Sequence, residues 1–224
     1  MFFNNYYKNK CSYGCVLYNY SKNYIYWENR NPTKDEVEIL DYLRNNFNNQ
    51  NLNILHIGIG SSFIANNLKN ISKIDGITIS QNEILNANKL NILNYRTFLI
   101  NKHQKDFLEL ILSKFNLKYD LIIDVNLKSF SCCQLSFEKV INNYSKLLNK
   151  NGLILSGTDG MNWTATLKPV FRFSFKKLFY KKLKEFPGPK NNVLTIKECI
   201  DLAYKNNLIF REIKNSNIVS FTKS

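Results

Sequence analysis

From residue 52 onward, short apolar runs alternate with segments in which apolar residues recur at helical spacing. The expected strands are 52–57, 74–79, 95–100, 119–125 and 152–156, and the expected helices are 62–71, 82–93, 105–115 and 134–149. Strands that alternate with helices at this spacing are typical of βαβ units, in which the strands pair in parallel. The pattern therefore predicts an α/β domain built on a parallel sheet.

Helix and strand signals also flank this alternating region. Before it, Thr33 and Glu36 have the spacing of a capping box, and Val37, Leu40, Leu43 and Phe47 form an apolar stripe. After it, Thr195 can cap a helix that runs to about residue 206. Two strands, 208–213 and 217–222, follow across an Asn-Ser-Asn turn and predict a hairpin at one edge of the sheet. Asn151-Gly152 predicts the stop of the preceding helix.

These signals divide the chain into an N-terminal extension and helix, residues 1–50, and a main domain, residues 51–224. The main domain contains an insert at about 157–194, which is too long for a plain connection and is therefore expected to be functional.

The stretch NILHIGIGSS, residues 53–62, places Gly58 and Gly60 one residue apart at the end of the first expected strand. The chain has only 8 glycines, and glycine costs backbone entropy on folding, so the pair suggests a geometric need. One such need is a tight strand-to-helix turn where a ligand meets the N–H groups of the next helix. The alternative is an ordinary turn between a strand and a helix.

Five stretches of the chain resemble, in order and spacing, those of class I S-adenosylmethionine-dependent methyltransferases over about residues 34–222. They are LNILHIGIGSS, IDGITISQNEI, NYRTFLINK, YDLIIDVN and FEKVINNYSKLLNKNGLILSGT. The resemblance implies a Rossmann-like three-layer α/β/α sandwich. Its sheet would be mostly parallel, with seven strands and an antiparallel C-terminal strand.

The resemblance also implies S-adenosylmethionine as cofactor. The residues that correspond to its binding positions are His56, Gly58, Gly60, Ser61, Ser62, Thr78, Ser80, Gln81 and Lys102. Three of these depart from the family pattern. His56 and Thr78 stand where acids are usual, and Lys102 stands where an aspartate accepts from the adenine amine. Lysine cannot accept a hydrogen bond, whereas the neighbouring His103 can do so in its neutral form. A nicotinamide-binding Rossmann domain is the rival interpretation, and Thr78 argues against it.

Asp124, at the end of YDLIID, and His103 are the candidate catalytic residues. Asp124 is placed to hold the cofactor, orient the acceptor or take its proton. The alternative is an aspartate that caps the next loop. The stretch after Asp124 lacks the [DN]PP[YF] motif of many amino methyltransferases that act on nucleobases. The adjacent Cys132 and Cys133 have no visible activating partner, so we expect structural cysteines there.

The formal net charge of +14 admits nucleic acid, an anionic membrane surface or an acidic substrate as a partner. It is equally consistent with codon bias, because Asn, Lys, Ile and Tyr are abundant as in AT-rich genomes. The distinctive part is Lys168–Lys190, where aromatic residues and lysines lie on opposite sides of a helical pattern. It is either a surface helix, a lid over an anionic substrate, or a contact for nucleic acid or a membrane surface.

No apolar stretch approaches the ~20 residues that span a bilayer, and the N-terminus lacks the apolar segment of a signal peptide. The five cysteines show no C-x-x-C spacing, so we expect reduced thiols, no metal site and a cytoplasmic protein.

The sequence therefore predicts an S-adenosylmethionine-dependent methyltransferase that acts on a small or medium-sized molecule, with an anionic acceptor as one option. The alternatives are an RNA methyltransferase, a non-catalytic binding protein, and a protein that uses the cofactor for a reaction other than methyl transfer. The oligomeric state stays open.

Overall fold

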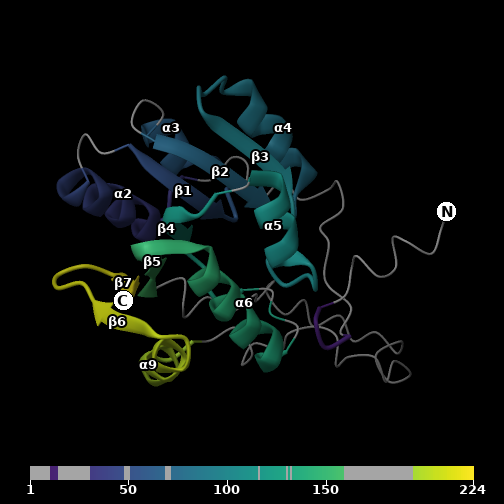
Figure 1. The fold of residues 1–224 in the computed structure, drawn as a ribbon. Helices are drawn as coiled ribbons and strands as arrows, with labels where there is room; N and C mark the ends of the chain where they lie inside the picture. The colour runs from purple at the N-terminus through teal and green to yellow at the C-terminus, as the bar shows by residue number, and fades with distance from the viewer. Residues whose placement is uncertain are drawn as a thin grey trace, which may run out of the picture.

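The computed structural model describes residues 11–14, 31–47, 51–68, 72–115, 117–129, 131, 133–158 and 194–224. In this part of the chain, seven strands form one sheet in the order β3-β2-β1-β4-β5-β7-β6 (Figure 1). The strands are β1 Leu52–Ile57, β2 Ser72–Thr78, β3 Tyr95–Leu99, β4 Tyr119–Asp124, β5 Leu148–Gly157, β6 Leu208–Glu212 and β7 Ile218–Lys223. The helices are α2 Lys34–Asn46, α3 Phe63–Leu68, α4 Gln81–Lys89, α5 Phe107–Phe115, α6 Gln134–Leu147 and α9 Ile196–Lys205.

The sheet is parallel from β3 to β5 and antiparallel at its other end. Strand β1 pairs in parallel with β2 and β4, and the outer pairs β2–β3 and β4–β5 are parallel as well. The C-terminal hairpin of β6 and β7 adds to β5 in the antiparallel sense. This mixed sheet confirms the predicted Rossmann-like fold and the predicted hairpin at its edge.

Apolar cores lie on both faces of the sheet, which gives the predicted three layers. On one face, α5, α6 and α9 pack through Phe107, Phe137 and Leu202 against strand residues such as Leu55. On the other face, α2 and α3 pack against alternate strand residues. That second core includes Ile39, Leu40, Leu43, Ile54, Ile64, Leu68, Leu121 and Ile123. Successive side chains of β1 and β4 thus point to opposite faces of the sheet and contribute to both cores.

The helix starts were predicted well from capping chemistry. Both Thr33 and Thr195 cap a helix, and in each case the glutamate three residues later completes the capping box. The predicted apolar stripe of α2 was wrong at one position, Val37. Val37 is 38% exposed, and Ile39 is fully buried in its place.

The boundary between α6 and β5 also differs from the prediction. The helix ends at Leu147 and β5 begins at once, so the expected helix 134–149 and strand 152–156 were displaced. Asn151 adopts a left-handed conformation with φ of 63° inside the strand, where β5 shifts its register against β4. Asn151-Gly152 therefore marks an irregularity of the strand, and the helix has already stopped. Most of the expected insert, residues 159–193, lies outside the described residues.

Candidate functional site

The strand registers bring four polar segments to one rim of the sheet. Ile57, the last residue of β1, pairs with Ile77 of β2 and Asp124 of β4, and Thr78 pairs with Leu99 of β3. The segments that follow these strands therefore leave the sheet side by side at its carboxyl edge. In open parallel sheets, this is the edge where ligands bind.

The glycine turn after β1 has the backbone conformation that the sequence suggested. Gly58 and Gly60 have φ of 69° and 51°, in the left-handed region that favours glycine. Ser62 follows with φ of 60°, and its N–H donates to the Ile59 carbonyl at 2.7 Å. No atom of the described residues would lie within 4 Å of a Cβ atom added to Gly58. Within the described part of the chain, the backbone at Gly58 is therefore not covered by a side chain.

Gly76 in β2 makes room for this turn to pack on the sheet. A Cβ atom at Gly76 would lie 2.7 Å from Ile59 Cγ2 and 2.9 Å from the Tyr95 hydroxyl. Ile59 is fully buried there, and the Tyr95 hydroxyl lies 3.0 Å from Ser62 Oγ. Burial raises the pKa of Tyr95, so its hydroxyl keeps its proton. Gly76 was not singled out in the sequence, although glycine inside a strand often marks such a close approach.

A buried carboxylate stands beside the turn, and it comes from α4. Glu83 Oε2 accepts from the Thr78 hydroxyl at 2.5 Å and from the Gly60 N–H at 3.2 Å. The N–H of Ser80 donates to Thr78 Oγ1 at 3.1 Å, and Ser80 caps α4 through the Glu83 N–H. Thr78, Ser80 and Glu83 are all buried. A carboxylate is thus present beside the end of β2, although residue 78 itself is a threonine.

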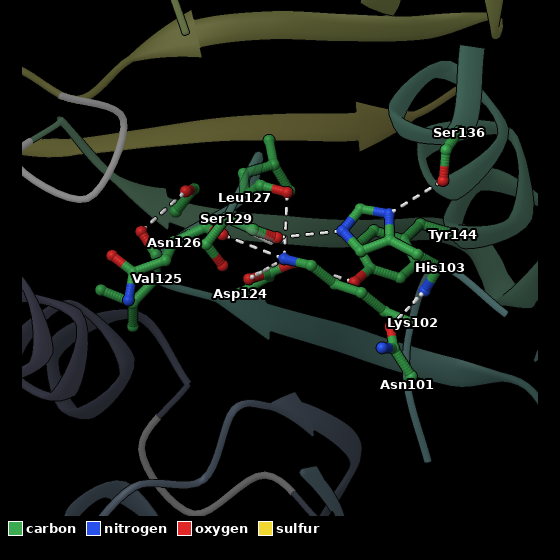
Figure 2. A network of polar contacts seen from close by, with 11 residues as sticks. Asn101, Lys102, His103, Asp124, Val125, Asn126, Leu127, Ser129, Ser136 and Tyr144 are labelled. Atoms are coloured by element: carbon green, nitrogen blue, oxygen red, sulfur yellow. Dashed lines mark hydrogen bonds and ion pairs between the residues drawn. The ribbon is translucent and has the colours of Figure 1, made fainter. Parts of the chain in front are cut away.

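On the other side of the rim, the ammonium group of Lys102 is enclosed by oxygen atoms (Figure 2). Its Nζ lies 2.8 and 3.1 Å from the carboxylate oxygens of Asp124, 2.9 Å from the Asn126 carbonyl and 3.0 Å from the Leu127 carbonyl. The Tyr144 hydroxyl donates to the same carboxylate at 2.8 Å. Burial lowers the pKa of Lys102, and the charge of Asp124 opposes that shift.

His103 lies next to this ion pair and is held from both ring nitrogens. Nε2 is 2.9 Å from the Ser129 carbonyl, and Nδ1 is 3.2 Å from Ser136 Oγ. Because a carbonyl only accepts, Nε2 carries the proton and the Ser136 hydroxyl donates to Nδ1. Burial, followed by the charge of Lys102, lowers the pKa of His103 to about 3. The imidazole is therefore neutral at physiological pH.

The remaining predicted residues lie in different surroundings. His56 is buried within β1, between Gly76 of β2 and Ile123 of β4. Ser61 is half-buried in the glycine turn, and Gln81 is exposed at the start of α4. Lys102, His103 and Asp124 lie close together but are buried, with Lys102 paired directly to Asp124 and His103 bonded to Ser129 and Ser136. Their predicted roles toward cofactor and acceptor stay predictions.

Comparison with solved structures shows which proteins share this architecture. No family model matches the sequence, and no curated protein matches it. The N-methyltransferase NodS from Bradyrhizobium japonicum WM9, solved with S-adenosyl-l-homocysteine, is similar with a TM-score of 0.56 and 15% identity. The match covers 91% of this chain and 93% of NodS.

Two further structures give the same picture. Magnesium protoporphyrin IX methyltransferase from Synechocystis PCC 6803, with bound SAH, has a TM-score of 0.55 and 14% identity over 84% of this chain and 82% of its own. A TehB-like SAM-dependent methyltransferase from Corynebacterium glutamicum has a TM-score of 0.54 and 14% identity, with 87% of this chain and 90% of its own covered. The chain therefore has the class I methyltransferase fold.

Proposed function

We propose that this protein is an S-adenosylmethionine-dependent methyltransferase whose acceptor is a small or medium-sized molecule. One observation carries the proposal. The glycine turn and the buried Glu83 carboxylate meet at the carboxyl ends of β1 and β2, joined by the bond from the Gly60 N–H to Glu83. A backbone approach and a carboxylate are the two features that the adenosine part of the cofactor needs there.

The residues present fit the cofactor, with two changes in the expected roles, at Glu83 and at Lys102. Glu83, supported by Thr78, would accept from the ribose hydroxyls in place of the usual acid at the strand end. Gly58 and Gly60, with Ser61 and Ser62, would form the backbone wall, and Ser80 and Gln81 would border the ribose at the start of α4. His56 would support the turn from within β1. Lys102 does not fit the position of an adenine acceptor, because its ammonium group turns inward to Asp124.

When bound, the cofactor supplies a methyl group already activated on a sulfonium. The protein then has to bind the acceptor, align it and exclude water, since positioning supplies much of the rate. Asp124 and His103 are proposed to act at the acceptor side. Because Lys102 and Tyr144 occupy the Asp124 carboxylate, we assign it an organising role and no proton transfer.

Binding of S-adenosylhomocysteine tests the proposal directly. We expect saturable binding in calorimetry, and we expect Gly60→Val to abolish it without changing the circular dichroism spectrum. Asn151→Val is the matched control, because Asn151 also has a left-handed backbone but is exposed in the first half of β5. Absence of binding by the parent protein, or unchanged affinity in Gly60→Val, would overturn the assignment.

An RNA acceptor is the second candidate, and the net charge of +14 favours it. The two candidates share the cofactor site and differ in the acceptor. Affinity for tRNA or rRNA with a steep dependence on salt would support the RNA enzyme.

A further inference from the structure

The segment after β4, residues 125–129 and hereafter the β4 loop, lies outside the helices and strands. Each of its five backbone carbonyls nevertheless accepts a hydrogen bond. The donors are Ser156 and Gly157 for Val125, Lys102 and Ser129 for Asn126, Lys102 for Leu127, Ser131 for Lys128, and His103 for Ser129. Buried carbonyls in native proteins are nearly always paired, and an irregular segment has no strand partner to do this.

Two consecutive side chains donate to the carbonyls of Leu127 and Ser129, and one of them joins the Ser129 N–H at the carbonyl of Asn126. Lys102 and His103 follow β3 and reach across the rim to the carbonyls of Asn126, Leu127 and Ser129 (Figure 2). Leu127 is fully buried and Ser129 is 7% exposed, so water is a poor substitute for either side chain. A second tether, from Lys128 to Glu198 at 2.9 Å, ties the same loop to the start of α9.

We propose that Lys102 and His103 are positioning residues that fix the β4 loop at the acceptor side of the site. This inference rests on the proposed function. The loop begins directly after Asp124, which pairs with Ile57 immediately before the glycine turn. The β4 loop therefore lies beside the methyl-donor end of the proposed cofactor site. Its conformation determines how an acceptor can bind there.

The alternative is that Lys102 only balances the buried charge of Asp124. The contacts separate the two roles, because the ammonium group meets a carboxylate on one side and two carbonyls on the other. Replacing Lys102 alone would leave the carboxylate unpaired and destabilise the fold. The informative variant removes both charges together.

The test compares Asp124→Asn with the double variant Lys102→Met/Asp124→Asn, which differ only at residue 102. The measurements are stability in denaturant, S-adenosylhomocysteine affinity by calorimetry, and hydrogen exchange of the β4 loop with and without that ligand. Asp124→Asn keeps a buried ammonium group without its carboxylate, so it should be the less stable of the two variants in denaturant. Both are compared under conditions in which they are folded, and both should bind the ligand within about threefold of the parent protein.

The two variants should differ in the loop. In Asp124→Asn the β4 loop should keep its slow exchange and gain protection when the ligand binds. In the double variant its amides should exchange at least about tenfold faster and gain no protection from the ligand, while the glycine turn still does. A double variant whose loop stays protected would overturn the role of Lys102. Failure of the parent protein to bind the ligand would instead overturn the proposed function.

His103→Gln provides an independent test should the double variant fail to fold. It removes a neutral ring and leaves the ion pair of Lys102 and Asp124 intact. We expect faster exchange confined to the end of the loop near Ser129, with ligand affinity retained. If exchange there is unchanged, His103 does not position the loop.

Discussion

The carboxylate of Glu83 joins three parts of the site through one oxygen atom. Oε2 accepts from Thr78 in β2 and from the Gly60 N–H in the glycine turn, and the residue itself belongs to α4. A charged acceptor is worth about twice a neutral one in a hydrogen bond. The proposed ribose site therefore depends more on the charge of Glu83 than on the hydroxyl of Thr78.

We expect Glu83→Gln to weaken S-adenosylhomocysteine binding by about tenfold, because the nearly isosteric amide loses roughly 1.4 kcal/mol of charge-assisted bonding. Calorimetry measures the change. Glu36→Gln is the matched control, because Glu36 also stands three residues after the N-cap residue, at the start of α2. If both variants bind like the parent protein, Glu83 does not contact the ligand.

The same geometry predicts that Thr78→Asp weakens ligand binding. The resemblance to class I methyltransferases points the other way, because an acid is usual at the position of Thr78 in those enzymes. In the structure, an aspartate at residue 78 would meet the Glu83 carboxylate, which now lies 2.5 Å from the Thr78 hydroxyl. Two carboxylates this close cannot both ionise without cost. Calorimetry should show weaker ligand binding in Thr78→Asp, and partly restored binding in the double variant Thr78→Asp/Glu83→Gln. Tighter binding in the single variant would contradict this prediction.

His103 predicts a loss of stability in acid. The folded protein keeps its imidazole neutral, with a pKa lowered to about 3, whereas the unfolded chain protonates near pH 6.5. Below pH 6.5 the unfolded state therefore binds more protons, and stability falls as the pH drops toward 3, by on the order of 1 kcal/mol per pH unit.

His103→Gln lacks this titration. Urea unfolding between pH 7 and 4 should therefore show a steeper loss in the parent protein than in the variant. Parallel curves would mean that the imidazole is accessible to protons in the folded state.

At the residue scale, the sequence around Glu83 indicates a helix start and does not indicate the contact of Glu83 with the glycine turn. Ser80 and Glu83 have the spacing of a capping box, which marks a helix start. Only Ser80 acts in that way, whereas the Glu83 side chain bonds to Gly60. That choice depends on how α4 packs beside the glycine turn. Periodicity does not encode such contacts between separate segments, and the inward turn of Lys102 toward Asp124 was hidden for the same reason.

At the scale of elements, the strand β2 is shaped to receive the turn after β1. Gly76 leaves a gap that Ile59 fills, with Tyr95 of β3 closing its side. This contact fixes the height of the glycine turn above the sheet. The turn is therefore positioned by packing as well as by its own glycines.

We expect Gly76→Ala to lower the free energy of unfolding by about 1–3 kcal/mol, because the new methyl group overpacks the contact with Ile59 and Tyr95. Gly58→Ala is the comparison. It has open space for the methyl group but a left-handed backbone, so its cost, about 1 kcal/mol, is conformational. Denaturant titration measures both. Equal stability of Gly76→Ala and the parent protein would show that the turn shifts freely.

Element types were easier to predict than their ends. The alternation of strands and capped helices follows local periodicity, and it gave the sheet, its layers and the edge hairpin. The early start of β5 depends instead on distant partners. Asn149 donates to Asp120 at 2.6 Å, and Lys223 donates to the Leu148 carbonyl at 3.0 Å. These contacts lie before Asn151 and accompany a strand that begins at Leu148. The sequence predicted a helix stop at Asn151-Gly152.

At the scale of the whole molecule, the fold separates the proposed cofactor side from the acceptor side. The glycine turn and Glu83 lie at the ends of β1 and β2, and the β4 loop lies at the end of β4, on the other side of β1 in the sheet order. No helix in the described part of the chain is long and apolar enough to cross a bilayer. The net charge of +14 is a property of the whole chain, and its role is tested by the salt dependence of binding.

The salt dependence of binding shows whether the net charge serves to bind an RNA acceptor. A protein that releases counterions from 6–10 nucleic-acid phosphates loses about 10³–10⁵ in affinity between 50 and 200 mM salt. For a small-molecule enzyme, we expect weak tRNA binding and S-adenosylhomocysteine affinity that changes by less than about threefold over this range. Titrations of tRNA, heparin and the ligand at several salt concentrations provide the measurement. Heparin separates a general polyanion effect from a preference for RNA. Tight tRNA binding that heparin does not match, with a steep salt slope, would instead make RNA the acceptor.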